Sequence, residues 1–599
     1  MILLSVIGIS ALLLTVAYWT YGPLLARLLR LDPEATTPAH QLRDDVDYVP
    51  LEPNALLSQH FSAIAAAGPI VGPILAGVMF GWLPALIWIL VGAIFIGGVH
   101  DMTSLTASIR HKARSIAEVT REHMSQRSFV LFLSFVWLAL VYIIVAFTDI
   151  TAAAFVGNVT LESGEIVSGG GIASSSLMYL GLPIVMGLML KYRVMGIGTA
   201  TIVFLPLVAL SIWLGQQFPF DLSTIVQSLN PDLTVADANI VTHKTWDVLL
   251  LLYCIVASVV PMWLLLQPRG HLGGYFLYAA LLGGTLGLAI QGITGAIRGT
   301  EPVQFPAFLG WQTPKGETLF PILFITIACG ACSGFHSLIA SGTTSKQLRR
   351  ETDAKLIGYG AMLLEGMVAV VSLCCVMVLA KGHTLLTDPK PNLIYAHGIG
   401  SFLEAFGIPA AFAVSFALMA FTTFVYDTLD VCTRLGRYII QELTGWHDAR
   451  GKWLGTLLTA GVPMIFVMQK VVDAKGNPVP AWRLFWSLFG ASNQLLAALT
   501  LLTVTIWLWR TRNAWWVWIV TGIPTAWMYV MSTWALSRMT YDALTASFKD
   551  GFKFDPVPWV GLVLLALALL MLLEAILIVF GSGSGPKRRP DLAAAALPT

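Results

Sequence analysis

The sequence has few charged residues. Asp, Glu, Lys and Arg make up 11% of its 599 residues, whereas they make up roughly 25% of a soluble domain. The net charge is only +2, and no basic tract is long enough to follow a phosphate backbone, which argues against a nucleic-acid partner. The six cysteines all lie in apolar stretches, so they do not indicate a secreted disulfide framework. Because 56% of the residues are hydrophobic, lipid is the predicted solvent for most of the chain.

Motifs of primary pumps and of common hydrolases are also absent. The sequence contains no Walker-type Gly-Lys-Ser/Thr, which argues against ATP-driven transport. It contains neither the His-Glu-x-x-His of zinc peptidases nor the Gly-x-Ser-x-Gly of α/β-hydrolases. We therefore expect neither an enzyme nor a resident cofactor.

Apolar segments of about 20 residues recur along the chain, and each is long enough to cross a bilayer as a helix. The first segment lacks a basic flank and is too long for a signal peptide, so it is interpreted as a retained span. The pattern predicts an all-α polytopic membrane protein with about 15 transmembrane helices. The segments lie near 2–22, 61–80, 83–108, 129–157, 173–190, 195–216, 246–266, 272–296, 319–340, 356–380, 406–433, 453–469, 484–508, 514–535 and 557–580.

The charges in the loops predict the orientation of the chain. Alternate loops form two sets, and one set holds 24 of the 35 Lys and Arg residues. Because basic loops stay in the cytoplasm, the N-terminus is predicted to be periplasmic and the C-terminus cytoplasmic. Residues 581–599 are low in complexity and are predicted to form a disordered cytoplasmic tail.

Two spans contain proline at a depth where a helix should be regular. The motif Gly68-Pro69-Ile70-Val71-Gly72-Pro73 lies in span 61–80, and Pro261 lies in span 246–266, five spans later. Proline removes backbone donors, and hydrocarbon tolerates such a break only beside protein or a wet cavity. Two discontinuous helices five spans apart predict a five-plus-five inverted repeat. A proline kink that serves only helix packing is the alternative.

The predicted repeats divide the chain into parts. The first repeat covers 61–216 and the second covers 246–433. Residues 1–22 would be an extra N-terminal helix, and 453–580 would hold four additional helices.

Several short motifs resemble the carbon starvation protein A family. The resemblance implies a bacterial inner-membrane transporter of peptides or pyruvate, driven by protons, with the inverted-repeat fold of the amino acid-polyamine-organocation superfamily. The choice between peptide and pyruvate stays open. The motifs are Thr37-Pro-Ala-His40, Asp47-Tyr-Val-Pro50, His60-Phe-Ser-Ala-Ile-Ala65, the Gly68–Pro73 break, Ser258–Arg269, Cys332-Ser-Gly-Phe-His-Ser337, Thr343-Thr-Ser-Lys-Gln347 and Phe489–Leu499.

Ionisable residues within the spans are candidates for proton coupling, because each costs about 2.5–3.5 kcal/mol in a bilayer. Histidine titrates near neutral pH, and a carboxylate in a drying cavity can also exchange a proton. We hypothesise that His60, Asp101, His336 and Asp427 line a pathway that faces the cytoplasm. Hydrogen bonding that only pairs helices is the alternative. The full set of candidates is His60, His100, Asp101, His336, Glu365, Asp427 and Asp430.

The backbone N–H groups at the start of a half-helix attract a carboxylate, which both a peptide and pyruvate carry. Gly68, Gly72 and Pro261 mark the predicted ends of the half-helices. Arg269 is interpreted as a positive-inside anchor rather than the partner of a carboxylate. Polar and aromatic contacts are predicted from Trp263, Gln267, Tyr426, Asn493 and Gln494.

Span 319–340 suggests two other readings. Cys329, Cys332 and His336 share a helix face and could hold a soft metal. Its serines and threonines could complete a sodium shell, or they could serve close helix packing. The alternatives to a proton symporter are therefore a sodium-coupled symporter of a small carboxylate, a cation channel and a membrane-embedded metalloprotein. No filter loop favours the channel.

Overall fold

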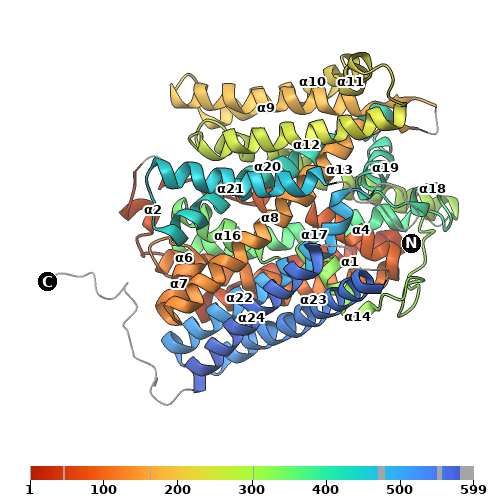
Figure 1. The fold of residues 1–599 in the computed structure, drawn as a ribbon. Helices are drawn as coiled ribbons and strands as arrows, with labels where there is room; N and C mark the ends of the chain where they lie inside the picture. Colours follow the sequence, from red (N-terminus) through yellow and green to blue (C-terminus); the bar gives the residue numbers. More distant parts are fainter. Residues whose placement is uncertain are drawn as a thin grey trace.

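The computed structural model describes residues 2–44, 48–161, 164–300, 302–469, 479–549 and 556–580. The predicted tail at 581–599 lies outside these ranges. Most helix axes run roughly parallel in one bundle (Figure 1). The described strands are the short hairpin β1 (Val159–Thr160) and β2 (Ile166–Val167). The predicted all-helical class is confirmed.

Among the described residues, twelve helices or helix runs are long and apolar enough to cross a membrane, and one bent helix pair raises the number to thirteen. The predicted count of fifteen is not confirmed, because segment 319–340 is divided into short helices and segment 514–535 belongs to a helix that does not pass this test. The twelve are Ile2–Leu29, Trp82–Arg110, Gln126–Val156, Gly169–Lys191, Ile197–Leu229, Val235–Val259, Leu266–Arg298, Glu351–Met377, Ala410–Thr444, Ala449–Met468, Ala481–Arg512 and Val557–Phe580.

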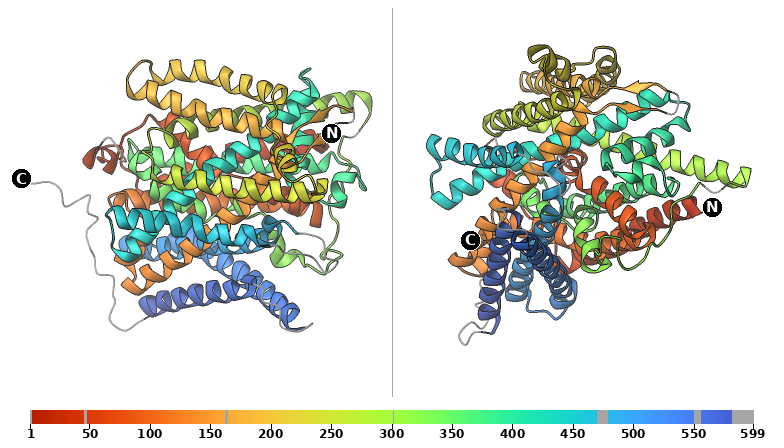
Figure 2. Two further views of the ribbon diagram at one scale, coloured as in Figure 1. Left: turned by 45° about the horizontal axis from the view of Figure 1, so that its top comes forward. Right: turned by 45° about the vertical axis from the view of Figure 1, so that its right-hand side comes forward.

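Two helix pairs flank the bundle on opposite sides (Figure 1, Figure 2). One pair is α9 (Gly169–Lys191) and α10 (Ile197–Gln217), and the other is α23 (Ile523–Lys549) and α24 (Pro556–Phe580). Ile202 on α10 is 75% exposed, as expected of an apolar side chain that faces lipid. The flanking pairs therefore shield the inner helices from the bilayer.

The predicted ionisable residues lie on helices between the two flanking pairs. Apart from the broken segments and the helices next to them, which are described below, the structure contains α1 (Ile2–Leu29), α2 (Pro38–Gln41), α5 (Trp82–Gly92), α7 (Ile116–His123), α8 (Gln126–Val156), α11 (Leu222–Leu229), α12 (Val235–Val259), α13 (Leu266–Arg298), α18 (Thr384–Thr387), α19 (Pro391–Glu404), α20 (Ala410–Thr444), α21 (Ala449–Met468) and α22 (Ala481–Arg512). It also contains the 3-10 turns η2 (Thr344–Lys346) and η3 (Glu351–Asp353) and the π-helix η5 (Trp518–Gly522).

The predicted break in span 61–80 is confirmed. Helix α3 (Pro53–Ile64) ends before Ala65–Ala67, and α4 (Gly68–Phe80) continues at an angle of 46°. The Gly-Pro motif itself forms the first turns of α4. Pro69 lies at the start of the helix, where a missing N–H costs nothing, whereas Pro73 lies inside it. Glycine is needed there because a Cβ on Gly68 would lie 2.3 Å from the sulfur of Cys329.

The predicted break in span 246–266 is wrong. Helix α12 is continuous from Val235 to Val259, and Pro261 lies beyond its end, in the connection to α13. Val260 is extended, with φ −71° and ψ 153°, as the residue before a proline prefers. The proline therefore ends a complete helix instead of interrupting one.

The second discontinuous helix is segment 319–342. It consists of α14 (Leu319–Thr326), α15 (Ala328–Ala331) and α16 (Phe335–Gly342). Helix α4 packs against α14 and α15, and α3 packs against α16. The two broken segments thus lie side by side, although six predicted spans lie between them in the sequence.

Two π-helices lie in the helices next to the breaks. One, η1 (Ala93–Gly97), runs into α6 (Gly98–Arg110), and the other, η4 (Lys355–Gly360), runs into α17 (Ala361–Met377). Single π-turns inside α-helices occur frequently at functional sites. Helices α6 and α17 carry Asp101 and Glu365, two of the predicted proton-coupling residues.

Basic loops from distant parts of the sequence meet at one end of the bundle. Arg110 donates to the carbonyls of Leu29 and Arg30, each at 2.9 Å, and Arg512 donates to Leu29 at 3.0 Å. At the same end in Figure 1 lie α2 and α7, and the N-terminus lies at the other end. The predicted orientation requires that the basic loops gather at one end of the bundle in this way. That this end faces the cytoplasm stays a prediction.

Candidate functional site

Four ionisable side chains form a continuous chain in the middle of the bundle, which we call the central cluster. Nδ1 of His336 lies 2.7 Å from Oδ2 of Asp101, and Nδ1 of His100 lies 2.7 Å from Oδ1 of the same carboxylate. Nε2 of His336 lies 3.1 Å from Oε2 of Glu365. All four side chains are 0% exposed. The structure therefore brings together four of the seven predicted candidates, of which Asp101 and His336 were predicted to line the same pathway.

The central cluster is assembled by the second broken segment and its neighbours. His336 is the second residue of α16, directly after the interruption at Cys332–Gly334. Asp101 lies in the first turn of α6, and Glu365 lies one turn into α17. Because His336 sits at the start of a short half-helix, a tilt of α16 would move its ring relative to both carboxylates.

The composition of the central cluster makes its charge sensitive to single protons. Two histidines face two carboxylates, so the cluster is neutral only when the numbers of protonated histidines and ionised carboxylates are equal. An uncompensated charge that is buried in this way costs several kcal/mol. Adding or removing one proton in the cluster would therefore be costly unless another charge nearby changed at the same time.

Asn493 on α22 holds the interruption of the second broken segment. Its Oδ1 accepts from the N–H of Phe335 at 2.9 Å, and its Nδ2 donates to Ser333 Oγ at 3.0 Å and to Cys329 Sγ at 3.3 Å. The next residue, Gln494, is 0% exposed, and neither atom of its amide has a hydrogen-bond partner among the described residues. A buried amide without partners is costly, which marks Gln494 as a place where a ligand or water could bind.

A second group of charges surrounds Arg269 on α13, and we call it the arginine network. The guanidinium lies 3.0 Å from Asp427 Oδ1 through Nε and contacts Asp430 through Nη1. Tyr253 donates to Asp430 at 2.8 Å, and the guanidinium lies over the ring of Tyr426 at 5.1 Å. Arg269 is 0% exposed. The interpretation of Arg269 as a loop anchor is therefore wrong.

The signal that could have found the arginine network is the spacing of its acids. Asp427 and Asp430 lie one turn apart on α20 and share a face. Two buried carboxylates require a cation, and Arg269 lies at the start of a neighbouring span. Asp427 and Asp430 share Arg269, and Arg434, one turn further along α20, is close enough to Asp430 for their charges to interact.

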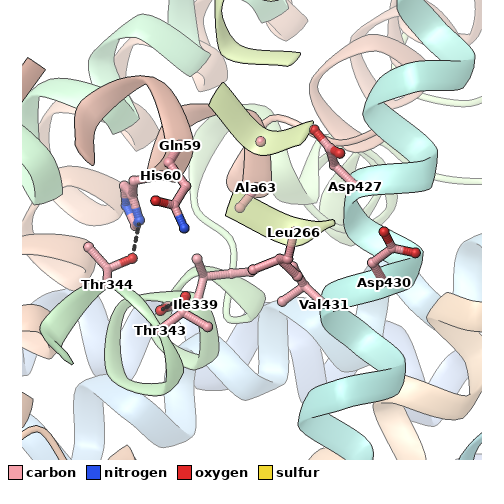
Figure 3. A pocket seen from close by; sticks show the side chains of 11 residues that line it. Gln59, His60, Ala63, Leu266, Ile339, Thr343, Thr344, Asp427, Asp430 and Val431 are labelled. Atoms are coloured by element: carbon pink, nitrogen blue, oxygen red, sulfur yellow. Dashed lines mark hydrogen bonds between the residues drawn. The ribbon is translucent and has the colours of Figure 1, made fainter. Parts of the chain in front are cut away.

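A cavity lies between the arginine network and the broken segments (Figure 3). Its volume is only about 20 Å³, which is room for about one water molecule, so a solute could enter only after the surrounding segments move apart. Nδ1 of His60 lies 2.8 Å from Oγ1 of Thr344, whereas its Nε2 has no hydrogen-bond partner among the described residues. The lining residues are Gln59, His60, Ala63, Leu266, Gly270, Ile339, Thr343, Thr344, Asp427, Asp430 and Val431.

The predicted solute-binding residues are divided among three places. Gly68 and Gly72 pack against the second broken segment, and Asn493 and Gln494 lie beside its interruption. Tyr426 belongs to the arginine network. The connection between α12 and α13 holds Pro261 and Trp263, and Gln267 opens α13.

The predicted metal face of span 319–340 has a different arrangement. Both ring nitrogens of His336 lie near carboxylates, so neither is directed at a cysteine. Cys329 accepts from Asn493, and Cys332 is fully buried. Within the described residues, the groups that could hold a metal lie elsewhere.

The fold and the buried charges define a class: a polytopic helical membrane protein in which two discontinuous helices lie beside a chain of ionisable residues. The particular family follows from the sequence. The sequence model described as carbon starvation protein CstA matches residues 2–388 and 380–535. The chain belongs to the carbon starvation protein family, as its motifs suggested.

Curated relatives carry two kinds of name. A pyruvate/proton symporter, BtsT of Escherichia coli, is 30% identical over 90% of this chain and 81% of its own. A peptide transporter, CstA of Helicobacter pylori, is 31% identical over 84% of this chain and 77% of its own. CstA of Bacillus subtilis, also named a peptide transporter, is 30% identical over 89% of both chains.

Solved structures give more distant likenesses. A manganese transporter of Eremococcus coleocola, determined as a single-residue mutant, has a TM-score of 0.44 and 14% identity over 89% of this chain and 97% of its own. MhsT in complex with L-phenylalanine has a TM-score of 0.46 and 11% identity over 88% of this chain and 99% of its own.

Proposed function

We propose that this protein is a secondary active transporter that imports a small solute with a carboxylate, a peptide or pyruvate, together with protons. The observation that carries the proposal is the placement of His336 at the start of a half-helix, between Asp101 and Glu365. A group that binds a proton is thereby attached to a segment that can change its position. The relatives named as peptide transporters and as a pyruvate/proton symporter support the same class of activity.

The proton path that we propose begins in the cavity. Asp427 belongs to the cavity lining and shares the single guanidinium of Arg269 with Asp430, so we place the uptake of a proton at Asp427. His60 also lines the cavity and is close enough to Asp101 and His336 for their charges to interact. A proton that enters at Asp427 or His60 can therefore pass to the central cluster without crossing hydrocarbon.

The solute site that we propose lies in the same cavity, next to the broken segments. The lining includes His60, whose Nε2 has no hydrogen-bond partner among the described residues, together with the hydroxyls of Thr343 and Thr344 and the amide of Gln59. These groups can donate hydrogen bonds to a carboxylate. Gln494 is a second polar group that is available near the interruption of 319–342.

We infer an inverted repeat that differs from the predicted one in its second half. Segment α3–α4 corresponds to α14–α16, α5–α6 to η4–α17, and α8 to α20, with a π-helix in both members of the second pair. Helix α13 packs against α3, and α22 packs against α14–α16 in the same way. The hairpin α9–α10 is then an insertion in the first half. A shift of seven spans is odd, so the two halves have opposite topologies.

The proposed location is the bacterial inner membrane, with the N-terminus in the periplasm and the C-terminus in the cytoplasm. The positive-inside rule supports this orientation, because the contacts of Arg110 and Arg512 place basic loops at one end of the bundle. The cavity then faces the cytoplasm.

Uptake into proteoliposomes tests the proposed function. Labelled pyruvate, dipeptides and tripeptides are offered under an imposed proton gradient, an imposed sodium gradient or neither. We expect saturable uptake of pyruvate or of peptides that the proton gradient increases. Uptake that responds only to sodium would establish the sodium-coupled alternative, and ion conductance without saturable uptake would establish a channel.

A further inference from the structure

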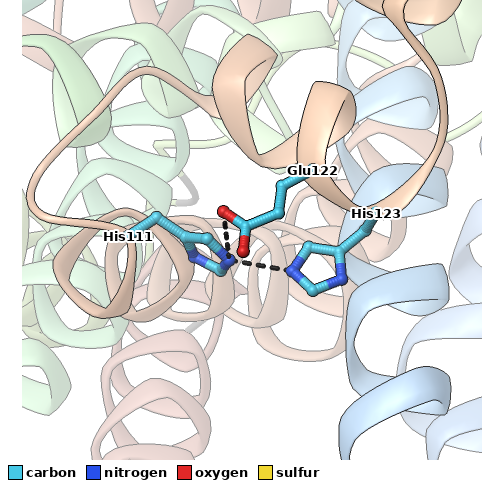
Figure 4. Close-up of side chains that lie close together, drawn as sticks. All are labelled: His111, Glu122 and His123. Carbon is cyan, nitrogen blue, oxygen red and sulfur yellow. Dashed lines mark hydrogen bonds and ion pairs between the residues drawn. The ribbon is translucent and has the colours of Figure 1, made fainter. Parts of the chain in front are cut away.

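A cluster of three metal-binding side chains lies at the basic end of the bundle, away from the cavity and the central cluster (Figure 4). His111 follows the end of α6, and Glu122 and His123 are the last residues of α7. Their ligand atoms all lie within 4.8 Å of one another. Figure 4 shows the two imidazole rings and the carboxylate directed toward one another.

We propose that His111, Glu122 and His123 form a binding site for one divalent transition-metal ion, with Zn²⁺ as the representative ion. Two imidazole nitrogens and one carboxylate oxygen are ligands that zinc commonly takes, and the fourth position of a tetrahedral site can hold water. The proposal concerns ion binding and is independent of the transported solute.

The hydrogen bonds of His111 prepare its ring for this role. Nδ1 of His111 lies 2.6 Å from the carbonyl oxygen of Ala107, so Nδ1 carries the hydrogen and Nε2 presents its lone pair. Metal-bound histidines are usually held by such a bond from the other ring nitrogen. The ring also packs edge-on against Trp507, with the centroids 5.9 Å apart. The orientation of Nε2 is therefore fixed by the protein.

The distances among the three groups are close to those of a metal site. Nε2 of His111 lies 2.8 Å from Nε2 of His123 and 4.0 Å from Oε2 of Glu122. Tetrahedral zinc with bonds of about 2.0–2.1 Å holds its ligand atoms roughly 3.3 Å apart. The two distances from His111 therefore need shifts of roughly 0.5 and 0.7 Å to reach that spacing, which side-chain rotation at the end of α7 can supply.

The surroundings allow an ion to enter. The side chain of Glu122 is 35% exposed, whereas that of His111 is 8% exposed, so the site has a solvent-facing side and a buried base. Arg510 is a nearby cation, and its Nη1 donates to the backbone carbonyl of His123 at 2.7 Å. A bound ion would join the end of α6 to the end of α7.

The test uses the full-length protein, purified without a polyhistidine tag and stripped with a chelator. Co²⁺ binding is followed by its visible absorption bands, and Zn²⁺ binding by displacement of Co²⁺ and by the rise in the thermal unfolding temperature. We expect one ion per chain. His123→Ala and Glu122→Gln should each weaken binding at least tenfold, and His40→Gln, an exposed histidine at the same end, should leave it unchanged.

Two results would overturn the proposal. One is a wild-type protein that takes up no Co²⁺ or Zn²⁺ above the level of a His111→Ala, His123→Ala double variant. The other is unchanged affinity in both His123→Ala and Glu122→Gln. Glu122→Gln keeps the size of a partly exposed side chain, so it provides a folded variant even if His123→Ala is unstable.

Discussion

The imidazole of His336 and the carboxylate of Asp101 lie 2.7 Å apart and are both fully buried. They join the second broken segment to α6, although they are 235 residues apart in the sequence. Because His336 also reaches Glu365, a movement of α16 would change the distance between one proton-binding ring and two carboxylates. In the mechanism that we propose, this relationship links a change of protonation to a change of structure.

Neutralising the carboxylates of the central cluster should uncouple transport from the proton gradient. In Asp101→Asn and Glu365→Gln, His336 keeps a hydrogen-bonding partner but loses a charge. We expect accumulation driven by a proton gradient to fall about tenfold or more, since coupling free energies of about 1–3 kcal/mol correspond to such factors. Exchange of labelled for unlabelled solute, which needs no net proton movement, should persist.

The matched control for this prediction is Glu574→Gln. Glu574 lies on the flanking helix α24, where it accepts from Ser125 at 3.1 Å. Its loss should leave the response to the gradient unchanged. Accumulation by both cluster variants at the wild-type level would show that the central cluster only pairs helices.

Removing the cation of the arginine network should destabilise the protein strongly. Arg269→Met leaves Asp427 and Asp430 buried without their cation, a change that costs roughly 3–5 kcal/mol. Combining it with Asp427→Asn and Asp430→Asn should restore much of the stability, because no uncompensated charge remains. Thermal unfolding in detergent measures both effects.

The exposed pair of Arg483 and Asp388 provides the comparison for Arg269. The side chain of Asp388 is 61% exposed, and exposed pairs contribute roughly 0–1 kcal/mol. Arg483→Met should therefore shift the unfolding temperature little. Equal shifts for Arg483→Met and Arg269→Met would contradict the role assigned to the network.

Two neighbouring amides should respond differently to substitution. Asn493→Ala removes the acceptor of the Phe335 N–H and should cost about 1–3 kcal/mol, as expected for a buried donor left unpaired. Gln494→Leu removes an amide that has no partner among the described residues, so stability should be kept or increased while uptake falls. Gln494→Leu with full uptake would show that no solute or coupling ion uses this amide.

The sequence predicted the elements that depend on local chemistry. The break in span 61–80 follows from Gly68, Pro69, Gly72 and Pro73, and the candidate proton-binding residues follow from the cost of charge in lipid. The partners of these residues were not predictable, because contacts such as His336 with Asp101 join segments that are far apart in the chain.

The failure at Pro261 has a physical reason. Helix α12 begins at Val235, well before the predicted start of the span at 246. The predicted span leaves out His243 and Lys244, but these side chains lie 3.2 and 3.9 Å from the buried Asp149 of α8. The pairing of these charges lengthens the helix inside the bundle, so the helix is complete when it reaches Pro261.

Adding a methyl group where the broken segments meet should separate them. A Cβ on Gly72 would lie 2.5 Å from the backbone oxygen of Thr326, which cannot move without shifting α14. Gly72→Ala should cost about 1–3 kcal/mol, as overpacking does, and should reduce uptake. Gly181→Ala on α9, where no atom lies within 4 Å of the added carbon, should be harmless, and equal effects of the two would argue against close packing of α4 on α14.

Labelling of engineered cysteines can locate the cavity relative to the membrane. All six native cysteines are buried, so the background reaction with a charged maleimide should be low. Ala63→Cys lies in the cavity lining, and Lys381→Cys is exposed at the opposite end of the bundle. If the basic loops are cytoplasmic, Ala63→Cys should react in inside-out vesicles and Lys381→Cys in right-side-out vesicles.

Transported solute should protect Ala63→Cys alone from the maleimide, because only this position lies where we place the solute. Protection of both positions, or of neither, would separate the cavity from the transport path.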